Sequence, residues 1–156
     1  MHDVAGRELD WSLTPREALA RFPADRRVAM LHSGRVHPRW ARWSVLAEPV
    51  GAWRFDEPPG GARGGRSVWL GDPAEAPARW WSHQPIADLE RCFHHAGLWI
   101  GYLGYDLGRW LEDLPRTAAA DRGWPVAQMH RCPGWLLHDG VTGRWRACGT
   151  WADPLS

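Results

Sequence analysis

Lysine and asparagine do not occur in this chain of 156 residues, and isoleucine occurs only at Ile86 and Ile100. All nineteen basic residues are therefore arginine. Such a bias is typical of a GC-rich coding sequence, so the arginine excess does not indicate selection for phosphate binding. The absence of lysine also excludes a P-loop, whose motif places a lysine beside the phosphates, and it excludes a lysine nucleophile.

The chain also lacks a charge excess of one sign, a cysteine framework and a long apolar run. Its net charge of +1 gives no reason to expect nucleic acid or an anionic membrane as a partner. Cys92, Cys132 and Cys148 are odd in number and far apart, which predicts neither disulfides nor a metal site. No leader-like segment opens the sequence, and no apolar run approaches the ~20 residues of a membrane-spanning helix. We therefore expect a cytoplasmic protein.

Tryptophan, in contrast, is abundant, with thirteen residues. Codon bias alone rarely raises tryptophan this far, so we expect some of these side chains in the core and others along a pocket or an interface. A chain of this length buries roughly 70% of its unfolded surface, and it needs no disulfide or metal to hold a core. We expect one domain over residues 1–156.

Short apolar segments separated by glycine and proline predict the elements. Strands are predicted at 27–32, 42–47, 52–55, 67–70, 98–104, within 129–138 and at 144–151, and helices at 15–22, 86–94 and 107–114. Thr14 and Glu17 predict a capping box at the first helix. Because strands follow one another with helices inserted, rather than alternating with them, the sequence favours an α+β fold with largely antiparallel sheets.

Residues 101–109 read Gly-Tyr-Leu-Gly-Tyr-Asp-Leu-Gly-Arg and join a predicted strand to a predicted helix. The glycine spacing does not match the G-x-G-x-x-G pattern of dinucleotide-binding folds. Glycine within a strand marks a bulge, or the close approach of a backbone or a ligand, so Gly101 and Gly104 predict one of these.

No catalytic constellation follows from the sequence. Asp106 is predicted to cap the helix after this turn, and Arg109 to pair with Asp106 or Glu112 across one helical turn. His94 and His95 are adjacent, so on a helix they point some 100° apart and form a poor metal pair. The sequence therefore predicts no catalytic residue and no metal site.

Two stretches carry a family resemblance when they are taken together. The first is Met30-Leu31-His32-Ser33-Gly34, followed by His-Pro-Arg-Trp-Ala-Arg-Trp-Ser at 37–44. The second is 101–109, with Glu112 and Leu114-Pro115 after it. In this order, they resemble the N-terminal domain of aminodeoxychorismate synthase component I (para-aminobenzoate synthase). The resemblance runs from about residue 14 to 151.

Anthranilate synthase component I shares this architecture, but it usually has a Glu-Ser pair where this chain has His32-Ser33. The His-Ser-Gly form favours the aminodeoxychorismate branch. The resemblance implies the α+β fold of the anthranilate synthase component I N-terminal domain. It also implies a place in chorismate amination toward 4-aminobenzoate and folate, a chorismate-binding catalytic domain or subunit as partner and, through it, a glutamine amidotransferase.

In this family the chemistry and its Mg²⁺ belong to a C-terminal chorismate-binding domain, whose motifs do not occur in these residues. We therefore expect no cofactor in this chain and no activity from it alone. The family's N-terminal domain also holds a tryptophan pocket. Matched by motif position, the residues implied to bind L-tryptophan are Ser33, Trp40, Ala41, Arg42 and Trp43.

The physical chemistry of these residues is compatible with such a pocket. Ser33 would offer a hydroxyl at the end of a strand to the amino-acid carboxylate or ammonium group. Trp40 and Trp43 would flank an indole by offset stacking. In the alternative interpretation, Trp40 and Trp43 are core aromatics and Arg42 is a surface residue.

The first functional hypothesis is a non-catalytic domain or subunit that completes a chorismate-binding subunit in trans, through an exposed apolar face that carries tryptophan. The second is an autonomous module that binds and senses an aromatic amino acid. A truncated anthranilate synthase component I, from tryptophan biosynthesis, is a further alternative. A tryptophan-rich carbohydrate-binding or interaction module rests on composition alone.

Overall fold

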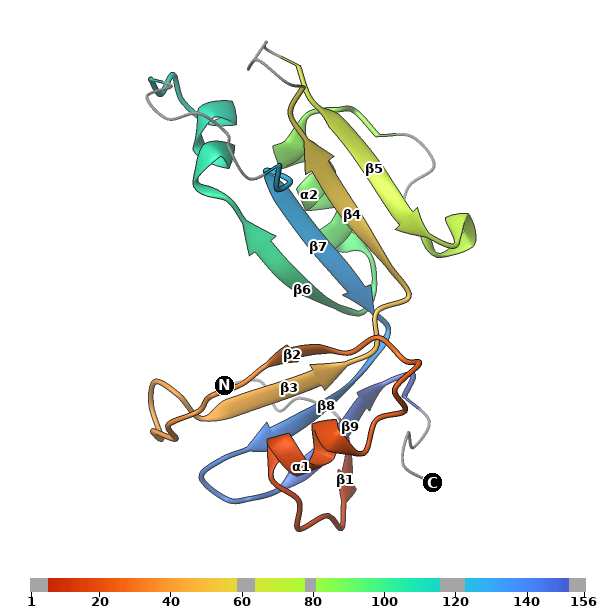
Figure 1. Ribbon diagram of the computed structural model, residues 1–156, viewed down its shortest axis with the longest axis vertical. Coiled ribbons are helices and arrows are strands. Elements are labelled where there is room, and N and C mark those ends of the chain that lie inside the picture. Colours follow the sequence, from red (N-terminus) through yellow and green to blue (C-terminus); the bar gives the residue numbers. More distant parts are fainter. Residues whose placement is uncertain (1–5, 59–63, 78–80, 116–122, 152–156) are drawn as a thin grey trace. The chain divides into compact units, whose positions relative to one another are not determined.

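The computed structural model describes residues 6–58, 64–77, 81–115 and 123–151 (Figure 1). The chain divides into two compact units, one of Met1–Pro49 with Cys132–Ser156 and one of Val50–Arg131. The elements are β1 (Arg7–Leu9), α1 (Pro15–Ala20), β2 (Ala29–Leu31), β3 (Trp43–Ala47), β4 (Gly51–Asp56), β5 (Arg66–Gly71), the 3₁₀-helix η1 (Pro73–Glu75), α2 (Pro85–His94), β6 (Leu98–Leu103), the 3₁₀-helix η2 (Tyr105–Trp110), β7 (Ala127–Cys132), β8 (Gly134–Asp139) and β9 (Trp145–Gly149).

The first unit is built on a five-stranded sheet in the order β1-β9-β8-β3-β2, in which every pair is antiparallel. Leu46 in β3 lies opposite Met30 and Leu136, so all three point to one face. Ala18 of α1 covers this face and joins Leu46, Leu136 and Trp145 in the core. The Trp145 indole nitrogen is satisfied inside this core, because it donates to the carbonyl of Leu13 at 2.7 Å.

The predicted capping box at α1 is confirmed. The Thr14 hydroxyl accepts from the backbone N–H of Glu17, and the Glu17 carboxylate accepts from the backbone N–H of Thr14 at 2.8 Å. Pro15 occupies the first helical turn, where its missing N–H costs nothing. These contacts lower the pKa of Glu17, chiefly through the backbone hydrogen bond.

The second unit is built on a four-stranded sheet in the order β5-β4-β7-β6. β4 pairs antiparallel with both β5 and β7 and places Trp53 and Phe55 on the covered face. Leu89 and Cys92 of α2, with Leu107 of η2, pack against these rings, and α2 lies across one face of the sheet in Figure 1. Strand and helix are thus joined by one apolar core.

A fully buried carboxylate fixes α2 to β5. Asp88 accepts from the hydroxyls of Ser67 and Ser82 at 2.5 and 2.6 Å and from the Ser82 backbone N–H at 2.9 Å. Arg91 adds an ion pair at 3.0 Å. Four donors thus offset the cost of removing this charge from water.

The predicted α+β class with antiparallel sheets is confirmed. The helix predicted at 107–114 is wrong, because the chain forms the 3₁₀-helix η2, which ends at Trp110. Gly108 weakens an α-helix here, and no side chain caps the start of the element. The single strand predicted within 129–138 is two strands, because Pro133 separates β7 from β8.

Candidate functional site

The segment between β2 and β3 carries the five residues that the sequence predicts to bind a ligand. His37 and Ala41 form a two-residue bridge, with N–H···O=C bonds of 3.0 and 3.1 Å. The His37 Nδ1 atom accepts from the backbone N–H groups of Arg39 and Trp40 at 3.2 and 3.3 Å. Ala41 therefore has a structural role, since its backbone closes a braced turn.

The base of this hairpin is a small polar cluster around Ser44. The buried Ser44 hydroxyl accepts from the backbone N–H of Ser33 at 3.2 Å and lies 3.1 Å from His32 Nδ1. The Ser33 hydroxyl donates to the carbonyl of Trp43 at 2.7 Å. The proton of this hydroxyl is therefore used in a hydrogen bond to the backbone, although its oxygen can still accept a hydrogen bond from a ligand.

Arg42 and Asp139 form a bidentate ion pair beside this cluster. Arg42 donates from Nε at 2.8 Å and from Nη2 at 2.5 Å to the two carboxylate oxygens. The guanidinium lies over the ring of Trp43, 4.6 Å from the ring centroid. The ion pair holds the pKa of Asp139 well below its usual range and raises that of Arg42. Within the described residues, no hydrogen bond is made by Nη1 of Arg42, so its two N–H donors can serve a ligand.

The exposure of the two tryptophans contradicts the alternative interpretation, in which both are core aromatics. Trp40 is 77% exposed and Trp43 is 41% exposed, so neither is a core aromatic. The ring contacts found among the described residues do not include a Trp40–Trp43 pair, and the flanking of an indole by these two rings stays a prediction. Ser33, Arg42 and Trp43 are brought together, and Trp40 contacts Arg39 instead.

Sequence reasoning missed three members of this neighbourhood, Ser44, His138 and Asp139. Ser44 lies opposite His138 across the β3–β8 pair. The His138 ring packs on Trp145 with centroids 4.7 Å apart, and its buried Nδ1 has no partner among the described residues. Burial lowers the pKa of His138. The period-2 alternation of β8 was the available signal, since it places His138 on the face of Leu136.

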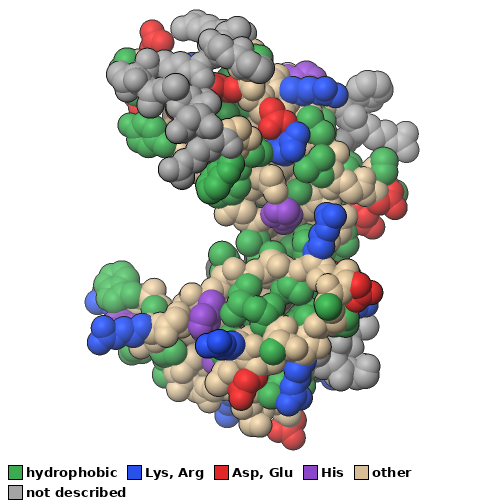
Figure 2. Space-filling model, in the orientation of Figure 1, with side chains coloured by type: hydrophobic (Ala, Val, Ile, Leu, Met, Phe, Trp, Pro, Cys, Tyr) green, Lys and Arg blue, Asp and Glu red, His purple; other side chains and the backbone are tan. Residues whose placement is uncertain are grey.

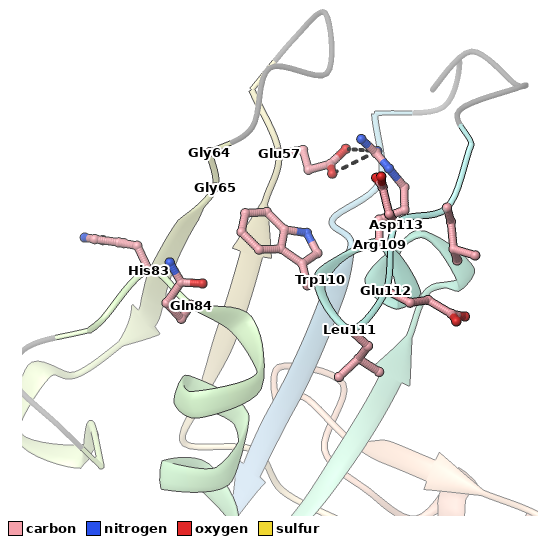
Figure 3. Close-up of a pocket in the computed structure, with 11 residues that line it drawn as sticks. Glu57, Gly64, Gly65, His83, Gln84, Arg109, Trp110, Leu111, Glu112 and Asp113 are labelled. Atoms are coloured by element: carbon pink, nitrogen blue, oxygen red, sulfur yellow. Dashed lines mark hydrogen bonds and ion pairs between the residues drawn. The ribbon is translucent and has the colours of Figure 1, made fainter.

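A separate cavity of about 660 Å³ lies within the second unit (Figure 3). Trp110, Leu111 and Leu114 supply its apolar lining, and polar residues include Glu57, His83, Gln84, Arg109, Glu112 and Asp113. Arg109 donates to the Glu57 carboxylate at 3.0 and 3.2 Å. Glu57 and Arg109 are both largely buried.

Two predictions for the turn at 101–109 are wrong. Arg109 pairs with Glu57, 52 residues away, and not with Asp106 or Glu112. Asp106 caps no helix, because Gly104 occupies the position before η2 and no side-chain hydrogen bond caps the element. Local spacing could not reveal Glu57, since this residue follows β4, which is distant from Arg109 in the sequence.

A backbone approaches Gly101 closely, which is one of the alternatives that the sequence predicts. A Cβ added at Gly101 would lie 1.9 Å from the carbonyl oxygen of Gln128 in β7. The aromatic side chains beside it are exposed, with Tyr102 at 40% and Tyr105 at 90%. The stretch thus presents side chains to solvent while its glycine lies against β7.

Metal ligands do not gather in the parts of the chain that the structure describes, where no three His, Cys, Asp or Glu side chains form a cluster. All three cysteines are buried, and none of them forms a disulfide within the described residues. Burial raises the pKa of Cys92 and of Cys132 to about 12, so these thiols stay protonated at neutral pH. Over the same described residues, no helix has the length and apolarity to cross a membrane.

The architecture places the chain in a class of α+β folds built from two antiparallel sheets with packed helices. No family model matches the sequence. No curated protein matches it either. Among solved structures, the fold is similar to anthranilate synthase component I from Streptococcus pneumoniae TIGR4, with a TM-score of 0.52 and 18% identity. The match covers 99% of this chain and 33% of that structure, so the chain spans about a third of its length.

Proposed function

We propose that the chain is the non-catalytic N-terminal domain or subunit of a chorismate-aminating synthase of the aminodeoxychorismate type. It completes a chorismate-binding catalytic subunit in trans, and a glutamine amidotransferase supplies the amine to that subunit. The observation that carries the proposal is the fold match along 99% of the chain to a third of anthranilate synthase component I. The stretches at 30–34 and 101–109 support it, because their sequence resembles the aminodeoxychorismate branch.

The proposal assigns the chemical steps and Mg²⁺ to the partner subunit. The described residues of this chain offer no cluster of ligands for the ion. The task of this chain is to bind the catalytic subunit and to keep it in its active conformation. A binding surface for that purpose must be exposed and apolar.

A surface along strand β6 fits this requirement. β6 is an edge strand, and Tyr102, Leu103, Tyr105 and Trp124 are all exposed there. The rings of Tyr102 and Trp124 lie 6.4 Å apart, and the Tyr102 hydroxyl donates to the Pro125 carbonyl at 3.1 Å. Tyrosine and tryptophan are enriched at the centres of protein interfaces. The outward side chains of the 101–109 stretch therefore serve as the docking surface in this proposal.

Adding the purified chain to a chorismate-binding subunit that lacks this domain tests the proposal. We expect a complex and a faster glutamine-dependent conversion of chorismate in the presence of Mg²⁺. Tyr105→Asp should weaken the complex, because it places a charge in the interface. Val141→Asp is the matched control, since Val141 is also exposed but lies in the other unit. No complex and no change in rate would contradict the proposal.

A second candidate function is L-tryptophan binding at Ser33, Trp40, Ala41, Arg42 and Trp43. Its specific support is the free Nη1 of Arg42 beside the half-exposed ring of Trp43. The amino-acid carboxylate would accept from Arg42, and the indole would stack on Trp43. Calorimetry with the chain alone separates a sensor from a docking domain. Heat that disappears in Trp43→Ala supports the site, and no heat at millimolar L-tryptophan rules it out.

A further inference from the structure

The β2–β3 hairpin ends in a tip, residues 35–40, that is both apolar and positively charged. The Arg39 guanidinium lies over the exposed ring of Trp40, 4.9 Å from its centroid. Arg35 and Arg39 form no ion pair within the described part of the chain. The sequence has no Asp or Glu in residues 26–47. At the end of this hairpin, Figure 2 shows a hydrophobic side chain beside arginine and histidine side chains.

The tip is held in a fixed conformation without any partner. The His37–Ala41 bridge closes its base, and His37 Nδ1 accepts from the backbone N–H groups of Arg39 and Trp40. Below it, Gly140 donates to the Arg42 carbonyl at 2.8 Å. An exposed indole that is already ordered loses little conformational entropy on binding, which favours its use as a binding group.

The cavity in the second unit has the complementary character. Among the described residues, its charged lining consists of the carboxylates of Glu57, Glu112 and Asp113 and the guanidinium of Arg109. Its wall includes the ring of Trp110, which packs edge-on against Phe55 with centroids 5.0 Å apart. The volume of about 660 Å³ lies within the range of pockets that enclose sizeable organic groups. An indole with an adjacent guanidinium fits this size and charge.

We propose that the tip of one copy of the chain docks in the cavity of a second copy. Trp40 would contact the apolar wall, and Arg39 would pair with the carboxylates of the rim, of which Glu112 is exposed. The contact joins different surfaces on the two copies. One copy therefore keeps an unoccupied cavity and the other keeps a free tip, and each can bind a further copy. It goes beyond the proposed function and does not depend on it.

Nucleic acid and membrane are weaker occupants for the tip. Proteins that bind DNA through phosphates commonly make roughly 6–10 such contacts, and the tip has two unpaired arginines. A single exposed tryptophan with two arginines also falls short of the polybasic clusters of four to eight residues that hold proteins at anionic lipids. A protein interface, in contrast, can depend on one tryptophan and one arginine.

Sedimentation equilibrium and light scattering of the purified chain, from micromolar to millimolar concentration, test this inference. We expect the mean mass of the wild type to rise with concentration. Trp40→Ala should weaken association by roughly thirtyfold, the size of an interface hot spot, and Arg39→Glu should abolish it. Trp124→Ala is the matched control, because Trp124 is 74% exposed but lies outside both surfaces. Arg16→Glu controls for net charge, since Arg16 is exposed on α1.

A charge swap identifies the partner surface. Glu112→Arg alone should remain monomeric, because the cavity then repels the tip. An equimolar mixture of Arg39→Glu and Glu112→Arg should associate again, since the unaltered tip of Glu112→Arg meets the unaltered cavity of Arg39→Glu, and the altered tip also matches the altered cavity in charge. Recovery in the mixture also shows that both variants are folded. A wild type that stays monomeric, association that Trp40→Ala leaves unchanged, or a mixture that stays monomeric would each overturn the inference.

Discussion

Arg42 and Asp139 are 97 residues apart in the sequence and form a bidentate ion pair at the end of the β3–β8 pair. The Asp139 carboxylate also accepts from the backbone N–H of Val141 at 3.0 Å. The pair therefore connects the β2–β3 hairpin to the turn between β8 and β9. It orients the Arg42 guanidinium over Trp43, so the geometry of the candidate ligand site depends on it.

We expect Asp139→Asn to destabilise the chain by about 1–2 kcal/mol, because a charged acceptor of several hydrogen bonds becomes neutral. The pKa of Asp139 is lowered in the folded state. The contribution of this carboxylate to the stability of the fold is therefore fully present above its unfolded pKa, near 4. It is lost as the pH falls through the folded pKa. Urea unfolding of wild type and variant between neutral pH and pH ~2 measures this difference.

Arg144→Ala is the control for that experiment. Arg144 reaches Glu8 at 3.5 Å, and both side chains are more than half exposed. Exposed ion pairs of this kind contribute ~0–1 kcal/mol, so the unfolding midpoint should change little. If Arg144→Ala lost as much stability as Asp139→Asn, the bidentate geometry of Arg42 and Asp139 would contribute no more than an exposed ion pair.

His138 predicts a second pH effect, in a different range. Burial lowers its folded pKa below the ordinary value of 6.5, and nearby Asp139 and His32 act in opposite directions. The unfolded state therefore binds more protons below pH ~6.5, so stability present above this pH is lost as the pH falls below it. In His138→Phe, the midpoint of unfolding should change less between pH ~7 and ~5 than it does in the wild type. An unchanged slope in this variant would contradict the assignment.

Sequence reasoning succeeded where the responsible contacts are local. The Thr14–Glu17 capping box spans three residues, and both partners are visible in the sequence. The limits of α2 and most strands follow from apolar periodicity and from nearby proline or glycine. The α+β class follows from the order of these elements alone.

It failed where a distant strand supplies the partner. Nothing near Arg109 indicates Glu57, 52 residues away, and nothing near Arg42 indicates Asp139. Nearby acids offered a plausible local pairing for Arg109, and the tertiary contact replaced it. The exposure of Trp40 was equally hidden, since a tryptophan in an apolar pattern is usually buried.

The buried carboxylate of Asp88 predicts a large loss of stability on mutation. Asp88→Asn removes the charge that four donors satisfy, and the new amide N–H₂ group would face the serine hydroxyls. We expect a loss of about 3 kcal/mol in the free energy of unfolding. Asp106→Asn is the control, because Asp106 is exposed on η2 and caps nothing, so its change should stay within about 0.5 kcal/mol.

Gly101 allows the sharpest test of the fold around the 101–109 stretch. The added Cβ of Gly101→Ala would lie 1.9 Å from a backbone oxygen of β7, and a backbone atom cannot move aside as a flexible side chain can. β6 would have to separate from β7, and with it the exposed ring of Tyr102 would move. We expect a loss of more than about 3 kcal/mol in stability, measured by urea unfolding.

Gly34→Ala is the matched control for Gly101→Ala, because a Cβ at Gly34 meets nothing within 4 Å. This variant should be as stable as the wild type or slightly more so, since alanine reduces the entropy of the unfolded chain by ~0.4–1 kcal/mol in compatible positions. If both alanine variants unfolded at the same urea concentration, the close approach of β6 and β7 at Gly101 would be wrong. If Gly101→Ala alone lost stability and also failed to bind the chorismate-binding subunit, the β6 surface would depend on the close packing of β6 against β7.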